Sequence, residues 1–215
     1  MLKWCKVSKC PWDRNTLSTA AREGHLDIVK WCRRQPNICR WNKYSFAAAV
    51  EGGHMDVVEW FHENGCHWDG VTSAAAARTG NLQMLMWCRA KGCPMDEATF
   101  AAAAEEGRSD VLLWCQAIQC PFDAKTCAAA ARGGQLQVLQ WLRQVGCPWD
   151  QATCTAAAGA GHLDLLMWCR SRSCPWHASA CSAAAIGGHL EVLMWLTRTG
   201  CRYFVNIRQV AAAAG

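Results

Sequence analysis

Apolar and polar positions form two kinds of short segment, seen clearly between residues 150 and 171. The segment QATCTAAAG at 151–159 follows Asp150 and includes a run of three alanines, and alanine has the highest helix propensity. The next segment, HLDLLMWCRS at 162–171, is apolar around most of the circumference that a helix would have. Gly161 separates the two, as glycine does just past a helix C-terminus. The pattern predicts two short helices, the second sandwiched between neighbouring units.

Both segments recur along the whole chain with a period of 27 residues, interrupted once by two extra residues between positions 31 and 39. Three columns show the period: Trp at 4, 31, 60, 87, 114, 141, 168 and 195; Cys at 10, 39, 66, 93, 120, 147, 174 and 201; and Gly at 24, 53, 80, 107, 134, 161, 188 and 215. Such a fixed period is the signature of a repeat architecture. With no strand pattern in any unit, the sequence predicts an all-α solenoid of stacked helix-turn-helix repeats. We expect one array over residues 1–215, of about seven units, with partial units at both ends.

The first helix of most units has a capping residue immediately before it. An Asp or Asn side chain at that position accepts hydrogen bonds from the exposed N–H groups of the first turn. The cap column is Asp13, Asn42, Asp69, Asp96, Asp123 and Asp150. His177 and Phe204 stand at the same position in the last two units, so we expect their helices to begin less firmly.

The unit resembles an ankyrin repeat over the entire chain. AARGGQLQVLQWLRQVGCPWD at 130–150 is similar to the family pattern of two alanines, a Gly–His step, an apolar segment and a terminal Gly-Ala. The segment AREGHLDIVKW at 21–31 is even closer to that pattern. The matching positions in the first segment are Ala130, Ala131, Gly134, Val138, Leu139, Leu142 and Gly146. The resemblance implies an ankyrin-like solenoid that acts as an interaction scaffold.

The unit departs from the family in its length and in one motif. The family repeat has about 33 residues, and the deficit falls between Asp150 and Thr153, where ankyrin repeats form a β-hairpin finger. The Thr-Pro-Leu-His opening of the first helix is also absent, and Trp149 replaces a smaller apolar residue. We therefore expect repeats without fingers. Similar short, Cys- and Trp-rich units occur in large DNA viruses and in protists, and a viral origin would place the protein in the host cytoplasm.

The 16 cysteines suggest a metal site, and five units carry a Cys-x4-Cys pair or its two-residue expansion. In the remaining units Phe61, Leu142 and Leu196 replace the first cysteine of the pair. A ligand cannot become Phe or Leu, whereas a small core hydrophobe can, so we expect buried thiols and no metal or other cofactor. Disulfides within a column are disfavoured because packed helices lie about 8–10 Å apart, farther than the Cα atoms of a disulfide.

Tryptophan and histidine are interpreted as structural residues. The second-helix tryptophans are expected in the core: Trp31, Trp60, Trp87, Trp114, Trp141, Trp168 and Trp195. The tryptophans of the Cys-Pro-Trp turn are expected to be half-buried. The histidines that follow the glycine column alternate with Asn81, Arg108 and Gln135, which share hydrogen-bonding capacity but not acid–base chemistry. We expect this column to tie each inter-helix turn to a neighbouring unit.

Charge and composition narrow the function further. The formal net charge is +5, but the Lys and Arg residues are scattered, so neither nucleic acid nor a membrane surface is indicated as a partner. The start, MLKWCKVSKCPW, lacks the apolar stretch of a signal peptide. Free thiols then favour a reducing compartment, the cytoplasm or the nucleus. No nucleophile, base and orienting acid come together in the pattern, so we expect no enzyme activity.

The sequence therefore predicts a non-catalytic scaffold that binds another protein. Variable residues within the fixed frame mark the candidate partner-binding positions, which are Arg14, Asn15, Lys43, Tyr44, Glu97, Lys125 and Gln151. Two alternatives stay open: a structural segment of a longer repeat protein, and a Cys-rich array that responds to metal or redox state. Because the chain starts within a second helix and stops after a first one, we also expect self-association, or fraying, at uncapped ends.

Overall fold

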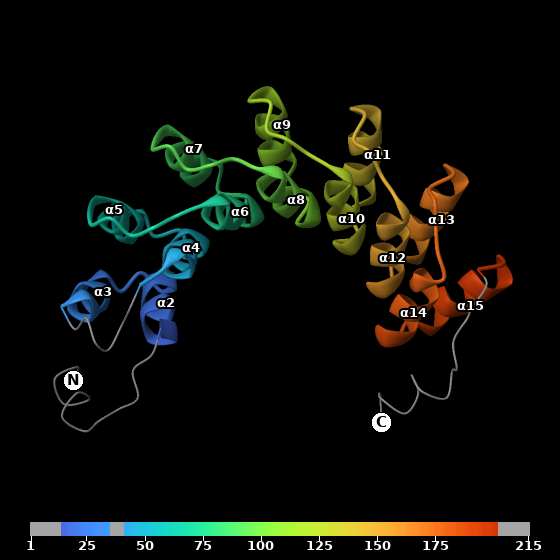
Figure 1. Cartoon of the computed structure of the whole chain (residues 1–215), viewed down its shortest axis with the longest axis horizontal. Helices are drawn as coiled ribbons and strands as arrows, with labels where there is room; N and C mark the ends of the chain where they lie inside the picture. Colours follow the sequence, from blue (N-terminus) through green and yellow to red (C-terminus); the bar gives the residue numbers. More distant parts are fainter. Residues whose placement is uncertain (1–13, 35–40, 202–215) are drawn as a thin grey trace, which may run out of the picture. The chain divides into compact units, whose positions relative to one another are not determined.

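The computed structural model describes residues 14–34 and 41–201, which belong to two compact units (Figure 1). One unit extends to Pro94, and the other begins at Met95. Every regular element in the described ranges is an α-helix, and no strand or hairpin finger occurs there. The predicted all-α architecture is confirmed, whereas a single array across both units stays a prediction.

The helices come in pairs, as the two-segment pattern predicts. The unit up to Pro94 contains α2 (Arg14–Arg22), α3 (Leu26–Arg33), α4 (Lys43–Gly52), α5 (Met55–Glu63), α6 (Gly70–Thr79) and α7 (Leu82–Ala90). The unit from Met95 contains α8 (Glu97–Glu105), α9 (Ser109–Ala117), α10 (Ala124–Arg132), α11 (Leu136–Gln144), α12 (Gln151–Gly159), α13 (Leu163–Ser171), α14 (Ser179–Ile186) and α15 (Leu190–Arg198). Even-numbered helices are the first of each pair, and odd-numbered helices are the second.

The predicted caps begin the first helices. The Asn42 side chain accepts a hydrogen bond from the N–H of Tyr44 at 2.9 Å, and Asp150 accepts one from the N–H of Ala152 at 2.8 Å. In the pair that has His177 at the cap position, α14 begins only at Ser179, and the His177 ring accepts from the N–H of Ser179 at a longer 3.3 Å. The helix begins later than its equivalents, and its weaker start stays a prediction. The cap expected at Asp13 and the weaker start expected at Phe204 lie outside the described residues.

Each unit has two layers of helices. First helices stack on one another in the order α2, α4, α6 and, in the other unit, α8, α10, α12, α14 (Figure 1). Small side chains permit this close approach, and Ala129, Ala130 and Ala131 of α10 are buried in the stack. Each second helix packs against its own first helix and contributes larger apolar side chains, such as Leu165 and Leu166 of α13. The core lies between the two layers.

The glycine–histidine step joins neighbouring pairs. Gly134 has φ +70°, a conformation that suits glycine, and the ring of His162 from the next pair lies where a Cβ atom on Gly134 would be. The Nε2–H of His162 donates to the carbonyl of Arg132 at 3.1 Å, and that of His189 donates to the carbonyl of Gly159 at 3.1 Å. Gln135 makes the equivalent bond to Glu105 at 3.4 Å. The structural role predicted for this column is confirmed at these positions.

A second column of bonds uses the cysteines just before the capped turn. Each thiol donates to the carbonyl oxygen of the cap residue 24 positions earlier, with S···O distances of 3.4–3.7 Å. The pairs are Cys66 with Asn42, Cys93 with Asp69, Cys120 with Asp96, Cys147 with Asp123, Cys174 with Asp150, and Cys201 with His177. A thiol is a weak donor. It adds a second donor to a carbonyl that already accepts the backbone N–H of the residue three positions later, such as Thr153 at Asp150.

These bonds predict the effect of changing His162. The variant His162→Ala should lower the free energy of unfolding by about 0.5–1.5 kcal/mol, the net contribution of one hydrogen bond. His162→Gln should restore most of that loss, because Gln135 makes the same bond in the preceding pair. Urea denaturation followed by circular dichroism measures both variants. Equal losses for Ala and Gln would show that the ring, and not the bond, stabilises the turn.

Candidate protein-interaction surface

The second helices leave one face open to solvent. The residue before the second-helix tryptophan is exposed in four pairs, by 50% at Met86, 57% at Leu113, 45% at Met167 and 43% at Met194. The apolar residues around these helices, which predicted a helix sandwiched between neighbouring units, are therefore not all covered. Second helices pack on first helices, and exposed apolar side chains of α9, α13 and α15 form a row along this layer, with Gln140 at the equivalent position of α11. We call this row and the two grooves described below the second-helix face.

The second-helix tryptophans line the core without being enclosed by it. Trp31, Trp60, Trp87, Trp114, Trp141, Trp168 and Trp195 are all half-buried. Fully buried side chains from the same helices, such as Leu139 and Leu142 of α11, fill the interior instead. In a helix of nine residues, fully buried and half-buried apolar positions lie close together. The apolar pattern alone therefore does not distinguish the two.

The turn tryptophans are half-buried, as expected, and pack edge-on against second-helix tryptophans. Trp149 contacts Trp168 with ring centroids 5.7 Å apart, and Trp176 contacts Trp195 at 6.2 Å. In the unit up to Pro94, Trp41 and Trp60 lie 5.8 Å apart. Each turn ring is therefore held on the second-helix layer and keeps one part open to solvent.

An arginine covers the other face of several turn rings. The guanidinium of Arg143 lies 4.5 Å from the ring centroid of Trp149, and that of Arg170 lies 4.2 Å from the ring centroid of Trp176. Arg170 also donates to the carbonyl of Cys174 at 2.6 Å, and Arg143 bonds the carbonyl of Cys147 in the same way. A cation over an indole face is attracted by the ring quadrupole. These arginines fix the turn that leads into the next pair.

Two grooves open between second helices in the unit from Met95. The larger, of about 530 Å³, lies between α11 and α13 and is lined by Gln140, Arg143, Gln144, Trp149, Trp168 and Arg172. The smaller, of about 260 Å³, lies between α9 and α11 and is lined by Ser109, Leu112, Leu113, Gln137, Val138 and Trp141. The larger groove combines indole rings, amides and two cations without a carboxylate. The smaller one is mostly apolar.

The partner-binding positions predicted from the sequence lie at the starts of first helices. Tyr44 is 59% exposed, and Asn15, Glu97, Lys125 and Gln151 are also exposed. Lys43 is half-buried and forms an ion pair with Asp69 at 2.9 Å. Arg14 begins α2, and its side chain lies outside the described residues. None of these residues lines either groove.

The described cysteines are all buried with free thiols, as predicted: Cys32, Cys66, Cys88, Cys93, Cys115, Cys120, Cys127, Cys147, Cys154, Cys169, Cys174, Cys181 and Cys201. Burial raises the pKa of the Cys66 thiol to about 12, which makes it a poor nucleophile at neutral pH. Most of these thiols therefore act as small core residues.

Comparison with known proteins supports the fold. No family model matches the sequence, and no curated protein matches it. Among solved structures, the chain is similar to the crystal structure of the human ASB11 ankyrin repeat domain. The TM-score is 0.50 and the sequence identity 16%, and the match covers 72% of this chain and 82% of that chain. At this identity the likeness shows an ankyrin-like solenoid and nothing about binding. Within the described residues, no helix is both long and apolar enough to cross a membrane.

The arginine–tryptophan contact can be tested by substitution. The variant Arg170→Met should lower the free energy of unfolding by about 1–3 kcal/mol, because it removes a cation–π contact and a charge-assisted hydrogen bond. The control Arg172→Met, at an exposed position in the same turn, should change it by less than about 0.5 kcal/mol. Thermal unfolding of both variants, followed by circular dichroism, measures the change in the free energy of unfolding at each position. Equal effects would mean that the contact over Trp176 contributes nothing to stability.

Proposed function

We propose that the protein is a non-catalytic scaffold that binds another protein through the second-helix face of the unit from Met95. The observation that carries the proposal is the exposed apolar row of Leu113, Met167 and Met194 beside two grooves. Exposed apolar patches of this kind mark interaction sites in proteins that otherwise cover their apolar residues. An all-α repeat layer also suits an extended partner, because its grooves repeat at a regular interval.

The composition of the larger groove supports a particular kind of partner. Trp and Arg are the residue types that contribute most to protein interfaces, and here Trp149, Trp168 and Arg143 are already held in place by mutual contacts. A side chain held in place before binding loses less entropy when the partner arrives. Arg143 and Arg172 face no carboxylate in the groove lining. The groove therefore fits a protein segment that presents a carboxylate next to apolar side chains.

The charges around the grooves favour a protein over a nucleic acid. Tryptophan and arginine together can also bind single-stranded nucleic acid by stacking. However, Asp110, Asp164 and Glu191 are exposed on the first turns of α9, α13 and α15. A continuous phosphate chain laid along these helices would be repelled by the carboxylates. A protein segment can place opposite charges at the two ends of the groove.

The first-helix starts form a second candidate surface for the same function. Tyr44, Glu97, Lys125 and Gln151 are exposed there and differ from pair to pair, as a specific contact surface requires. Their side chains include few large apolar groups and lie outside the grooves. We therefore place the main contact on the second-helix face and use the first-helix starts as the comparison surface.

The two surfaces can be separated with a displayed peptide library selected on the immobilised full chain. Enriched peptides should combine carboxylates with apolar residues, and added salt should weaken their binding. Met167→Glu and Arg172→Glu should each weaken binding at least about tenfold, a loss of about 1.4 kcal/mol. The matched controls Lys125→Glu and Gln151→Glu should leave the affinity unchanged. Because all four sites are exposed, each variant should keep its unfolding free energy within about 0.5 kcal/mol.

Other outcomes have different meanings. Loss of binding only in the Lys125 and Gln151 variants would place the contact on the first-helix starts and contradict the surface proposed here. Failure to enrich any peptide, together with no protein retained in affinity purification from cells, would favour the structural-segment alternative.

A further inference from the structure

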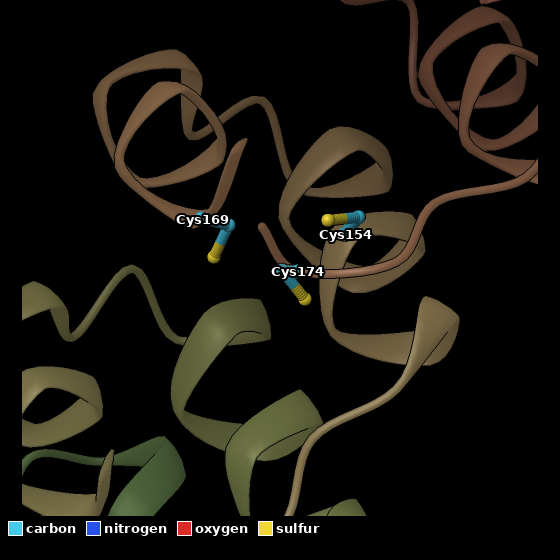
Figure 2. Close-up of side chains that lie close together, drawn as sticks. All are labelled: Cys154, Cys169 and Cys174. Carbon is cyan, nitrogen blue, oxygen red and sulfur yellow. The ribbon is translucent and has the colours of Figure 1, made fainter. Parts of the chain in front are cut away.

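Three cysteine thiols meet in the core of one helical pair. Cys154 comes from α12, Cys169 from α13, and Cys174 from the turn that follows α13 (Figure 2). Their Sγ atoms all lie within 4.8 Å of one another, and all three side chains are fully buried. We call these residues the cysteine triad. It lies beneath the second-helix layer and takes no part in the proposed protein contact.

The same three positions hold at most two cysteines in the other pairs that the structure describes. The preceding pair has Cys127, Leu142 and Cys147, and the following pair has Cys181, Leu196 and Cys201. Earlier pairs have Phe100, Cys115 and Cys120; Ser73, Cys88 and Cys93; and Phe46, Phe61 and Cys66. The triad is therefore the one described place where three sulfurs converge.

The three thiols act on one another and on a neighbouring cation. Hydrogen bonds from Cys169 and Cys174 lower the pKa of Cys154, and the same contact with Cys154 raises the pKa of Cys169. The positive charge of Arg170, which is bonded to the carbonyl of Cys174 at 2.6 Å, further lowers the pKa of Cys154. The contact with Cys154 also raises the pKa of Cys174, so negative charge is stabilised on the Cys154 sulfur alone, and a bound metal has to displace the protons of the other two thiols.

We propose that the cysteine triad binds one copper(I) ion through three thiolates. Thiolates are soft ligands that select copper(I) and zinc. Zinc takes four ligands in nearly all structural sites, and catalytic zinc sites keep a position for water. Here no His, Asp or Glu of the described residues joins the three sulfurs, and the site is closed to solvent. Copper(I) is satisfied by three sulfurs alone.

The geometry needs only a small closure. A metal–sulfur bond of about 2.3 Å, as for zinc, places three sulfurs around a planar centre about 4 Å apart. The Sγ atoms, within 4.8 Å of one another, therefore have to approach by less than about 1 Å. Each copper–sulfur bond that forms replaces an S–H bond or uses an existing thiolate, and every displaced proton leaves to solvent. Copper remains in the +1 state, so no oxidant is needed, and Arg170 offsets part of the negative charge.

The repeats supply matched variants for the test. Cys169→Leu reproduces the preceding pair, in which the fully buried Leu142 occupies that position. Leu142→Cys adds the missing third sulfur between Cys127 and Cys147 and should create a second triad. The full chain, reduced and kept without oxygen, is loaded with copper(I) and challenged with a copper(I) chelator such as bathocuproine disulfonate.

Wild type should retain one equivalent of copper, Cys169→Leu none, and Leu142→Cys two. X-ray absorption at the copper edge should show three sulfur ligands in wild type. Thiol titration of unfolded wild type should return all 16 cysteines, which excludes disulfide formation as the cause of any loss of copper binding.

Three outcomes would each overturn the proposal: equal copper retention by wild type and Cys169→Leu, no retention by wild type, or retention of zinc but not copper. Should Cys169→Leu lose its helical circular dichroism, Cys154→Phe takes its place, because Phe100 fills the same position in an earlier pair.

Discussion

The stacking of one helical pair on the next is the interaction on which every other feature depends. A pair of two nine-residue helices cannot enclose its own apolar side chains, so the core exists only where neighbours meet. The alanine-rich first helices make this contact at close range, as in the fully buried Ala130 and Ala131. Two columns of bonds then hold the spacing. His162 and its equivalents bond the turn of the preceding pair, and Cys174 and its equivalents bond the preceding cap. Small side chains let the first helices pack closely. The second helices carry larger side chains and leave space between neighbours, and the grooves lie in that space.

Local chemistry makes much of the fold predictable from the sequence. The period, the helix pairs and the caps all depend on residues close together in the chain, and the described residues have the helix pairs and the caps Asn42 to Asp150 at the predicted places. The open face is not predictable in this way, because Leu165 and Met167 look alike in an apolar segment while only Leu165 turns toward the first helix. Which side of a short helix is covered depends on the neighbouring pair, and that is a property of the stack.

The candidate site has a signal in the sequence that appears only when two columns are compared with each other. The two columns are the turn tryptophan and the residue two positions after the second-helix tryptophan. In every unit that has a turn tryptophan, this second residue is Lys, Arg or His. The pairs are Lys6 with Trp12, Arg33 with Trp41, His62 with Trp68, Arg143 with Trp149, and Arg170 with Trp176. Where the turn residue is Phe122 or Tyr203, that position is Gln116 or Thr197. A basic or imidazole residue therefore accompanies every turn tryptophan, as the contacts of Arg33, Arg143 and Arg170 explain, and Arg89 before Met95 keeps the cation without the ring. The cysteine triad has no comparable signal, because its members lie in three columns that each accept other apolar residues.

The thiol bond to the cap carbonyl has a consequence for how such a chain can grow. Between described residues, donor and acceptor are 24 residues apart, in Cys66 and Asn42 as in Cys174 and Asp150. A duplication or deletion of 27 residues, wherever it begins within a repeat, regenerates the same donor and acceptor at the new junction. A duplication whose length is not a multiple of 27 residues puts the thiol out of register with that carbonyl at the junction. Unequal recombination between copies of the coding sequence would therefore lengthen or shorten the protein in whole repeats, and the exposed row would lengthen or shorten with it.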